Sequence, residues 1–196
     1  MAINKLIALI FDLDGTLVKL PIDYNKLREE LKKLASSHGI LSEFKPLISE
    51  IERVSKNNEK LAEECLRILE KYEEEAAEKA EVIPGAEKCL SMLKNRGMKI
   101  AIASNNSNSC VGKALRRVNL LKYIDVIIGR EGFKVKPELL SIAMDKLNVN
   151  KENVIMIGDS QSDLRAAESI GIKCYIFEGE NLFEFVRGIL LNQVMD

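Results

Sequence analysis

Apolar residues in this chain follow two different periods, and the change of period divides the sequence. The segment Ile7–Phe11 is an unbroken apolar run that ends in carboxylates, which is typical of a strand buried on both faces of a parallel sheet. From residue 82 onwards, short apolar runs alternate with helical patterns. Strands are expected at 99–104, 124–128, 154–157 and 173–177, and helices at 86–95, 109–118, 138–147, 163–169 and 182–191. This alternation predicts an α/β fold, a Rossmann-like parallel sheet with helices on both faces.

Residues 18–81, in contrast, follow a helical period alone. Apolar residues recur there every three or four positions in three groups, which begin at Leu27, Leu47 and Leu61. Because the first strand belongs to the sheet, this segment is expected to be an all-helical insertion at the carboxyl edge. The predicted division is a core domain of residues 1–17 and 82–196 and a helical cap domain of residues 18–81, placed to act as a lid. The acidic run Glu73–Glu75 is expected to form a solvated helix face.

Composition and charge exclude several classes of protein. The chain has 196 residues, of which 46% are hydrophobic and 30% charged, as in a soluble globular protein. The formal net charge of −1 gives no overall field that would attract nucleic acid or an anionic membrane, so neither is expected as a partner. The four cysteines are scattered, which fits neither a zinc site nor a disulfide scaffold. The apolar runs are too short for a signal peptide or a membrane span, and a cytoplasmic location is therefore expected.

Polar side chains that could act together follow four of the predicted strands. They are Asp12 and Asp14 after the first strand, Ser104 after the second, Lys136 after the third, and Asp159 and Asp163 after the fourth. Each also has a simpler interpretation as a turn residue, a helix cap or a surface lysine. Because parallel strands place their carboxyl ends at one edge of the sheet, all six side chains are expected to meet there. Their convergence favours a functional site.

The residue types in this set suit the transfer of a phosphoryl group. Asp12, Asp159 and Asp163 offer the hard oxygen ligands that Mg²⁺ prefers. Ser104 and Lys136 offer a hydrogen-bond donor and positive charge to an anion. A cation and an anion held beside a carboxylate favour nucleophilic attack on phosphorus, which gives an aspartyl-phosphate. A second carboxylate two residues further on could protonate the leaving oxygen and then activate water.

The order of these motifs resembles that of the haloacid dehalogenase-like superfamily. The motifs are Asp12-Leu13-Asp14-Gly15-Thr16, Ser104-Asn105, Lys136-Pro137, and Gly158-Asp159 followed by Asp163. The helical insertion directly after the first motif is similar to that superfamily's helical cap. The segment Ile83-Pro84-Gly85-Ala86, where the chain re-enters the core, resembles the phosphoglycolate phosphatase-like branch.

The resemblance implies a role for each carboxylate. Asp12 would be the nucleophile and a metal ligand. Asp14 would be the general acid and base, and its backbone carbonyl would bind Mg²⁺. Asp159 would bind the metal through its side chain, and Asp163 would support the metal site directly or through water.

The resemblance also implies how the phosphoryl group is held. Ser104 would donate a hydrogen bond to it, helped by the backbone at Asn105, and Lys136 would neutralise both the phosphoryl group and the nucleophile. Lys134 is the rival for the last role, but Lys136 followed by Pro137 matches the motif better.

The function that follows is that of a Mg²⁺-dependent phosphatase acting on a small organic phosphomonoester, with phosphoglycolate as the example. Asp14 argues against the dehalogenating members, which lack a carboxylate at that position. Three alternatives stay open: a phosphomutase of the β-phosphoglucomutase type, a phosphonate hydrolase that uses a cap lysine (Lys19, Lys26, Lys32 or Lys33), and a non-catalytic regulatory protein.

The cap arginines Arg28, Arg53 and Arg67 could meet a substrate carboxylate, although a surface position or a helix ion pair suits each better. The oligomeric state, monomer or homodimer, is also open.

Overall fold

The computed structural model describes residues 6–192, and its centre is a parallel β-sheet. Within this part of the chain, five strands lie in the order β5–β4–β1–β6–β7, and every neighbouring pair is parallel. They are β1 (Ala8–Phe11), β4 (Lys99–Ser107), β5 (Val126–Arg130), β6 (Val154–Gly158) and β7 (Lys173–Ile176). β1 is the middle strand and all its residues are buried, which explains why the first apolar run has no polar alternation. The predicted parallel sheet is confirmed.

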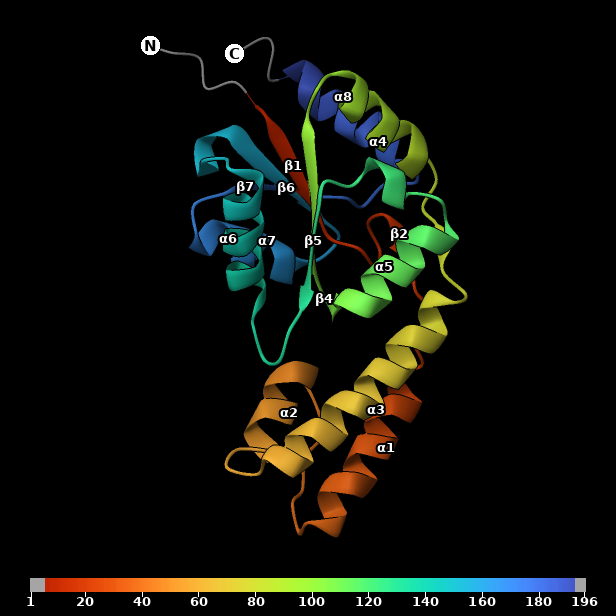
Figure 1. Ribbon diagram of the computed structural model, residues 1–196, viewed down its shortest axis with the longest axis vertical. Helices are drawn as coiled ribbons and strands as arrows, with labels where there is room; N and C mark the ends of the chain where they lie inside the picture. Colours follow the sequence, from red (N-terminus) through yellow and green to blue (C-terminus); the bar gives the residue numbers. More distant parts are fainter. Residues whose placement is uncertain (1–5, 193–196) are drawn as a thin grey trace.

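Helices cover both faces of this sheet (Figure 1). Leu9 and Phe11 of β1 point to the face covered by α4 (Ala86–Asn95), α5 (Asn108–Arg117) and α8 (Leu182–Asn192). Ala8 and Ile10 point to the opposite face, covered by α6 (Lys136–Leu147) and α7 (Gln161–Ser169). Successive residues of a strand face opposite sides, so a strand with helices on both sides must be apolar throughout. The predicted helices match the observed ones closely.

Three helices between β1 and α4 form a further layer beyond one end of the sheet (Figure 1). α1 (Tyr24–Ser37), α2 (Leu47–Val54) and α3 (Glu59–Ala77) enclose their own cluster of buried apolar residues, including Leu27, Phe44 and Ile51. We call these three helices the helical module. Its separate cluster explains the three apolar groups in the sequence, because each helix buries one stripe against the other two. None of the described helices has the length and hydropathy that a membrane crossing requires.

A short antiparallel ribbon connects the helical module to the sheet. β2 (Val18–Lys19) pairs with β3 (Glu81–Val82), so that Val18 lies opposite Val82. The turn after β1 is tied to this ribbon, because the Gly15 N–H donates to the Val18 carbonyl over 2.8 Å. The junction of the module is thereby placed directly beside Asp14.

The end of α3 packs against the core as well as the module. Leu61, Cys65 and Leu69 belong to the module's apolar cluster, whereas Ala76 and Ala77 join the cluster beneath the sheet. Polar contacts continue the attachment to α5, since Lys113 pairs with Glu78 over 2.7 Å. α3 is therefore the element that fixes the module to the core.

Candidate active site

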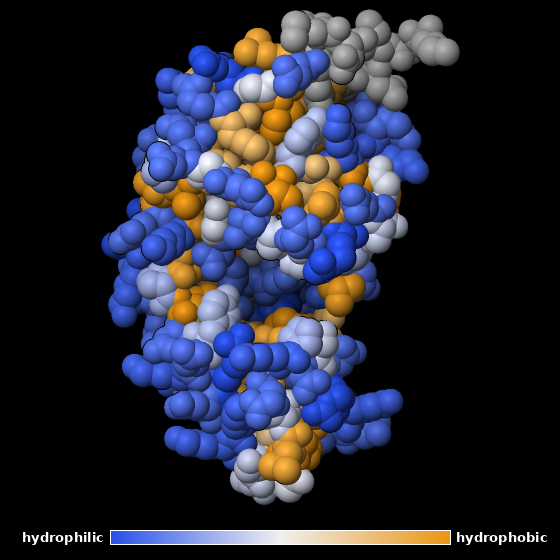
Figure 2. Space-filling view, turned by 180° about the vertical axis from the view of Figure 1, so that it is seen from behind, coloured by the Kyte–Doolittle hydropathy of each residue, from blue (hydrophilic) through white to orange (hydrophobic). Residues whose placement is uncertain are grey.

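The carboxyl ends of the strands and the helical module enclose a pocket of ≈ 480 Å³. Its size is that of a small-molecule site. The sheet side contributes every residue of the predicted site: Asp12, Asp14, Ser104, Asn105, Lys136, Asp159 and Asp163. The module side contributes mostly apolar residues together with polar ones such as Tyr24 and Glu52. The space-filling view shows a hydrophilic hollow between the sheet and the module, with hydrophobic surface on its module side (Figure 2).

Three carboxylates form a candidate cation site in this pocket. Oxygens of Asp12, Asp159 and Asp163 all lie within 4.8 Å of one another. Asp12 follows β1 directly, and its N–H donates to the Ile157 carbonyl of β6 over 2.9 Å, which holds the two strand ends together. Three hard anionic oxygens at this spacing fit a divalent cation.

Glycine at position 15 permits this close approach. Gly15 has a φ of +80°, and a Cβ placed there would lie 2.1 Å from Asp159 Oδ2. A side chain would therefore both strain the backbone and displace Asp159. The glycine that the sequence suggests as a turn residue also makes room for a carboxylate of the site.

Lys136 lies between two of the carboxylates. Its Nζ is 2.6 Å from Asp12 Oδ1 and 3.0 Å from Asp163 Oδ1, and it donates to the Ala103 carbonyl over 3.0 Å. Burial lowers the pKa of Lys136, but the two carboxylates outweigh burial and raise it above its usual value. The surface-lysine interpretation is wrong for this residue. Lys134 also lines the pocket, but it is partly exposed and pairs with Glu131 over 3.6 Å.

Burial controls the protonation of the two carboxylates after β1. It raises the pKa of Asp12 to about 6, although Lys136 acts in the opposite direction. Burial also raises the pKa of Asp14, and a hydrogen bond of 2.7 Å from the Leu20 N–H to Asp14 Oδ1 partly offsets this. The hydrogen bond fixes the orientation of Asp14, and the raised pKa makes its protonated form more accessible than that of an exposed aspartate.

Asp163 has two functions that use different oxygens. Its Oδ2 accepts hydrogen bonds from Ser160 Oγ over 2.6 Å and from the Ser160 N–H over 3.3 Å, and the second bond completes a capping box at the start of α7. Its Oδ1 faces Lys136. The N-cap of α7 is therefore Ser160, and Asp163 supports the cap from the third helical position while its other oxygen faces the site.

Ser104 lies in the pocket wall and caps no helix. β4 continues past it to Ser107, with an irregular register against β5 between Ala103 and Ser107. Ser107 caps α5 by accepting from the Cys110 N–H, so the helix-cap interpretation of Ser104 is wrong. Ser104 is 1% exposed, and its hydroxyl donates to Asn106 Oδ1 over 3.1 Å.

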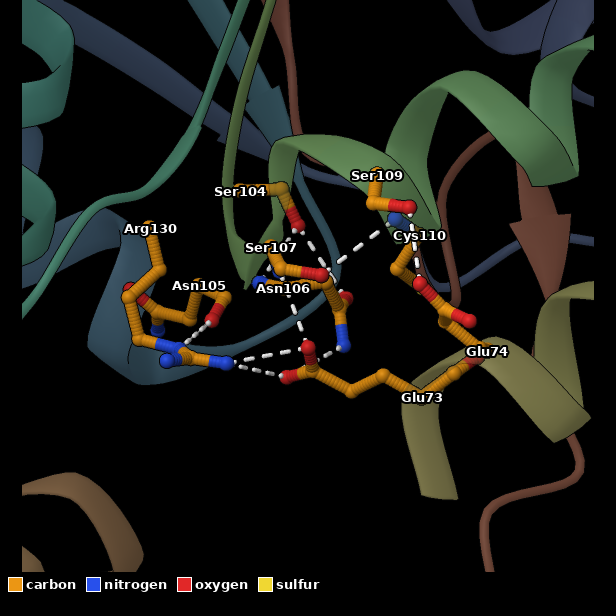
Figure 3. Close-up of polar contacts among 9 residues, drawn as sticks. All are labelled: Glu73, Glu74, Ser104, Asn105, Asn106, Ser107, Ser109, Cys110 and Arg130. Carbon is orange, nitrogen blue, oxygen red and sulfur yellow. Dashed lines mark hydrogen bonds and ion pairs between the residues drawn. The ribbon is translucent and has the colours of Figure 1, made fainter. Parts of the chain in front are cut away.

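The prediction that the acidic run Glu73–Glu75 of α3 forms a solvated helix face is wrong for Glu73. Glu75 is exposed as expected, but Glu73 is 2% exposed and pairs with Arg130 (Figure 3). Glu73 also lines the pocket. A signal for its burial was present, because Glu73 lies four residues after Leu69 on the apolar stripe of α3. A carboxylate on that stripe must have a buried partner, and the sequence pattern did not reveal Arg130 as that partner.

The comparison with known proteins decides the family. The family model of haloacid dehalogenase-like hydrolases matches residues 9–177. The chain belongs to this family. A phosphoglycolate phosphatase of Cereibacter sphaeroides is 31% identical over 183 residues, which cover 86% of this chain and 83% of the relative. A phosphorylated carbohydrates phosphatase of Thermotoga maritima is 28% identical over 185 residues, covering 85% and 82% of the two chains. The resemblance drawn from the motifs is confirmed.

Solved structures show the same haloacid dehalogenase-like fold. A phosphatase from Thermococcus onnurineus superposes with a TM-score of 0.65 at 24% identity, covering 94% of this chain and 98% of the other. A β-phosphoglucomutase from Clostridium difficile superposes with a TM-score of 0.68 at 21% identity, covering 97% and 100%. Because a phosphatase and a mutase fit equally well, function must be argued from the site.

Proposed function

We propose that this protein is a phosphatase that hydrolyses small organic phosphomonoesters through an aspartyl-phosphate. One observation carries the proposal: Asp12, Asp14 and Lys136 converge on one wall of a pocket of small-molecule size. The names of the relatives, which include phosphoglycolate phosphatases, support the same activity. The pocket and the family together favour a phosphoric monoester hydrolase.

Asp12 is the proposed nucleophile. One of its carboxylate oxygens attacks phosphorus, the new bond from that oxygen to phosphorus forms, and the bond from phosphorus to the leaving oxygen breaks. Lys136 lies 2.6 Å from Asp12 Oδ1, so its charge reduces the repulsion between the carboxylate and the phosphoryl dianion. Ser104 and the backbone N–H of Asn105, which line the same pocket, donate hydrogen bonds to the phosphoryl oxygens once the single hydroxyl proton of Ser104 turns from Asn106 Oδ1 to the substrate.

Asp14 is the proposed general acid and base. In its protonated form it gives its proton to the leaving oxygen as that oxygen departs. As a carboxylate it then accepts a proton from water, which attacks phosphorus and breaks the bond to Asp12. The raised pKa of Asp14 favours the first step, and its hydrogen bond from Leu20 holds it in place for both.

The cation proposed for the site is Mg²⁺. Asp12, Asp159 and Asp163 would hold it, together with the backbone carbonyl of Asp14, because hard oxygen donors suit this ion. When bound, the ion supplies positive charge that offsets the charges of the nucleophile and the phosphoryl group.

Residues 18–81 are the proposed cap domain over a core of residues 1–17 and 82–196. The module forms the pocket wall opposite the carboxylates, where the leaving group of the substrate would lie. Closure of this wall would exclude water from the aspartyl-phosphate until the leaving group departs.

The module side of the pocket favours a phosphatase over a phosphomutase or phosphonate hydrolase. Among the described module residues that line it, none is lysine or arginine, whereas a mutase must hold a second phosphate and a phosphonate hydrolase needs a cap lysine. Arg53 instead pairs with Glu50 over 2.8 Å, and Arg28 donates to the Phe44 carbonyl over 3.3 Å. The cap arginines do not line the pocket and are therefore not the residues that recognise the leaving group of the substrate.

The test is the release of phosphate from p-nitrophenyl phosphate and a panel of phosphomonoesters in the presence of Mg²⁺. Wild-type protein should turn over, and Asp12→Asn should lose turnover completely while keeping its melting temperature within a few degrees. The panel should include phosphoglycolate, neutral sugar phosphates and a bisphosphate, because their order of kcat/KM identifies the leaving group. Retained turnover in Asp12→Asn would overturn the assignment of the nucleophile.

A further inference from the structure

A buried ion pair joins the helical module to the wall of the pocket. Glu73 lies in α3 of the module, and Arg130 is the last residue of β5. One guanidinium nitrogen of Arg130 lies 3.0 Å and 2.9 Å from the two carboxylate oxygens of Glu73. Each side chain is 2% exposed. The pair lies outside the Asp12, Asp159 and Asp163 cluster, and none of the proposed chemical steps uses it.

Both partners also hold the segment that follows Ser104 (Figure 3). Arg130 Nε donates to the Asn105 carbonyl over 3.0 Å, and Glu73 accepts from the Ser107 N–H over 3.0 Å. Glu73 also receives a longer hydrogen bond of 3.5 Å from Asn106 Nδ2. The segment Ser104–Ser107 is thus attached at three successive residues to one ion pair.

Asn106 carries the connection on to the predicted phosphate ligand. Its Oδ1 accepts from the Ser104 hydroxyl over 3.1 Å, and its own N–H donates to Ser104 Oγ over 3.2 Å. Asn106 is 9% exposed, so water does not replace these bonds easily. The position of the Ser104 hydroxyl and the direction of the Asn105 peptide therefore depend on Glu73 and Arg130.

Burial of this pair imposes a geometric requirement. A carboxylate and a guanidinium removed from water lose hydration that only close pairing and further hydrogen bonds can offset, so such a pair is weak evidence for stability. The pair does strongly favour one position of α3 relative to β5, because a displaced α3 would leave Arg130 without its carboxylate partner. Docking of α3 and the shape of the Ser104–Ser107 segment are consequently coupled.

We propose that Glu73 and Arg130 are positioning residues, forming a latch between module and core that holds the Ser104–Ser107 segment in its phosphate-binding shape. The latch rests on the proposed function, in that Ser104 and Asn105 are taken to bind the phosphoryl group. The side-chain partner of Asp12 is Lys136, and neither latch residue is bonded to Asp12 in the described part of the chain. Loss of the latch therefore weakens phosphoryl binding more than it slows the chemical step.

The experiment uses the full chain with Mg²⁺ and measures KM and kcat for p-nitrophenyl phosphate and the Kd of inorganic phosphate by calorimetry. Glu73→Gln and Arg130→Met should each raise KM and the phosphate Kd by about tenfold or more, with a smaller fall in kcat. The double variant should be no worse than the worse single variant, because both act on one unit. The matched control is Glu74→Gln, which removes the charge of a neighbouring α3 carboxylate that accepts a 2.9 Å hydrogen bond from Ser109 of α5 but does not touch the Ser104–Ser107 segment.

A second variant tests the latch if these proteins fold poorly. Asn106→Ala keeps the ion pair and the backbone N–H bond to Ser104 Oγ but removes the side chain that connects Glu73 to Ser104, so the less restrained segment should also raise KM and the phosphate Kd. Wild-type values of both constants in folded Glu73→Gln or in Asn106→Ala would overturn the latch. Absence of turnover in the wild-type protein would instead count against the proposed function, and phosphate calorimetry would still test the latch.

Discussion

At the scale of single residues, the contacts of Lys136 organise the sheet side of the pocket. It is the first residue of α6, yet its Nζ reaches Asp12, Asp163 and the Ala103 carbonyl. The two carboxylates face each other across this ammonium group. Without it, two buried like charges would share one region, which raises the cost of ionising either.

Lys136→Met should therefore affect both activity and stability. The variant keeps the length and the apolar stem of the side chain but leaves Asp12 and Asp163 without their common partner. We expect kcat to fall on the order of 10²–10³-fold, and the metal-free protein to lose about 3–5 kcal/mol of unfolding free energy. Phosphate release and urea denaturation measure the two effects. Lys134→Met is the control. An equal loss of activity in that variant would contradict the assignment of this role to Lys136 alone.

Site residues in the sheet strands, or in the segments that directly follow them, were predictable, whereas those of the helical module were not. Asp12 and Asp159 directly follow strands, Ser104 ends the apolar part of β4, and Lys136 begins the helix after β5, so topology alone brings them to one edge of the sheet. Glu73 reaches the same edge from α3, and its partner Arg130 is far away in the sequence. Helical phase indicates that Glu73 faces inward, but the partner depends on how the module docks, which no local pattern encodes.

At the scale of elements, the turn after β1 shapes the cation site. Gly15 adopts a left-handed conformation and packs its Cα side against the carboxylate of Asp159. Gly39, which follows α1, has a similar φ of +72° but no atom within 4 Å of an added Cβ. Substitution of either glycine would strain the backbone. Only a side chain at position 15 would also collide with another residue, Asp159.

Gly15→Ala and Gly39→Ala separate these two effects. Both substitutions should cost about 1–2 kcal/mol through the left-handed backbone. Only Gly15→Ala should also displace Asp159, and we expect it to weaken apparent Mg²⁺ affinity by about tenfold or more. Melting curves and a Mg²⁺ titration of activity provide the measurements. If both variants kept wild-type Mg²⁺ affinity, Asp159 would not depend on the space that Gly15 leaves.

The regular elements were predictable because each helix buries a periodic apolar stripe and the central strands are short apolar runs. The short ribbon of β2 and β3 was not predicted, since two residues per strand are too few to show a period. The predicted end of the second strand at Ser104 was also too early. β4 continues through Asn105 and Asn106, which are polar residues held there by contacts with Glu73 and Arg130 rather than by strand propensity.

At the scale of the whole molecule, the charge of the site differs from the charge of the chain. The chain carries a formal net charge of −1, but four aspartates and one buried lysine line the sheet side of the pocket, with Lys134 at its margin. Folding brings these carboxylates together, and the unfolded chain keeps them apart. A cation that binds the assembled carboxylates therefore binds the native state preferentially and must stabilise it.

Adding Mg²⁺ to metal-free protein should thus raise the melting temperature even without substrate. At a concentration one hundred times its Kd, the ion adds about 2.7 kcal/mol, which for a chain of this size corresponds to roughly 5–11 °C. Calorimetry at matched ionic strength separates specific binding from screening, because NaCl should give little of this increase. Asp159→Asn should lose most of the shift, since it removes a ligand while leaving the Lys136 contacts intact. An equal shift in wild-type protein and Asp159→Asn would place the ion elsewhere and remove the physical basis of the proposed cation site.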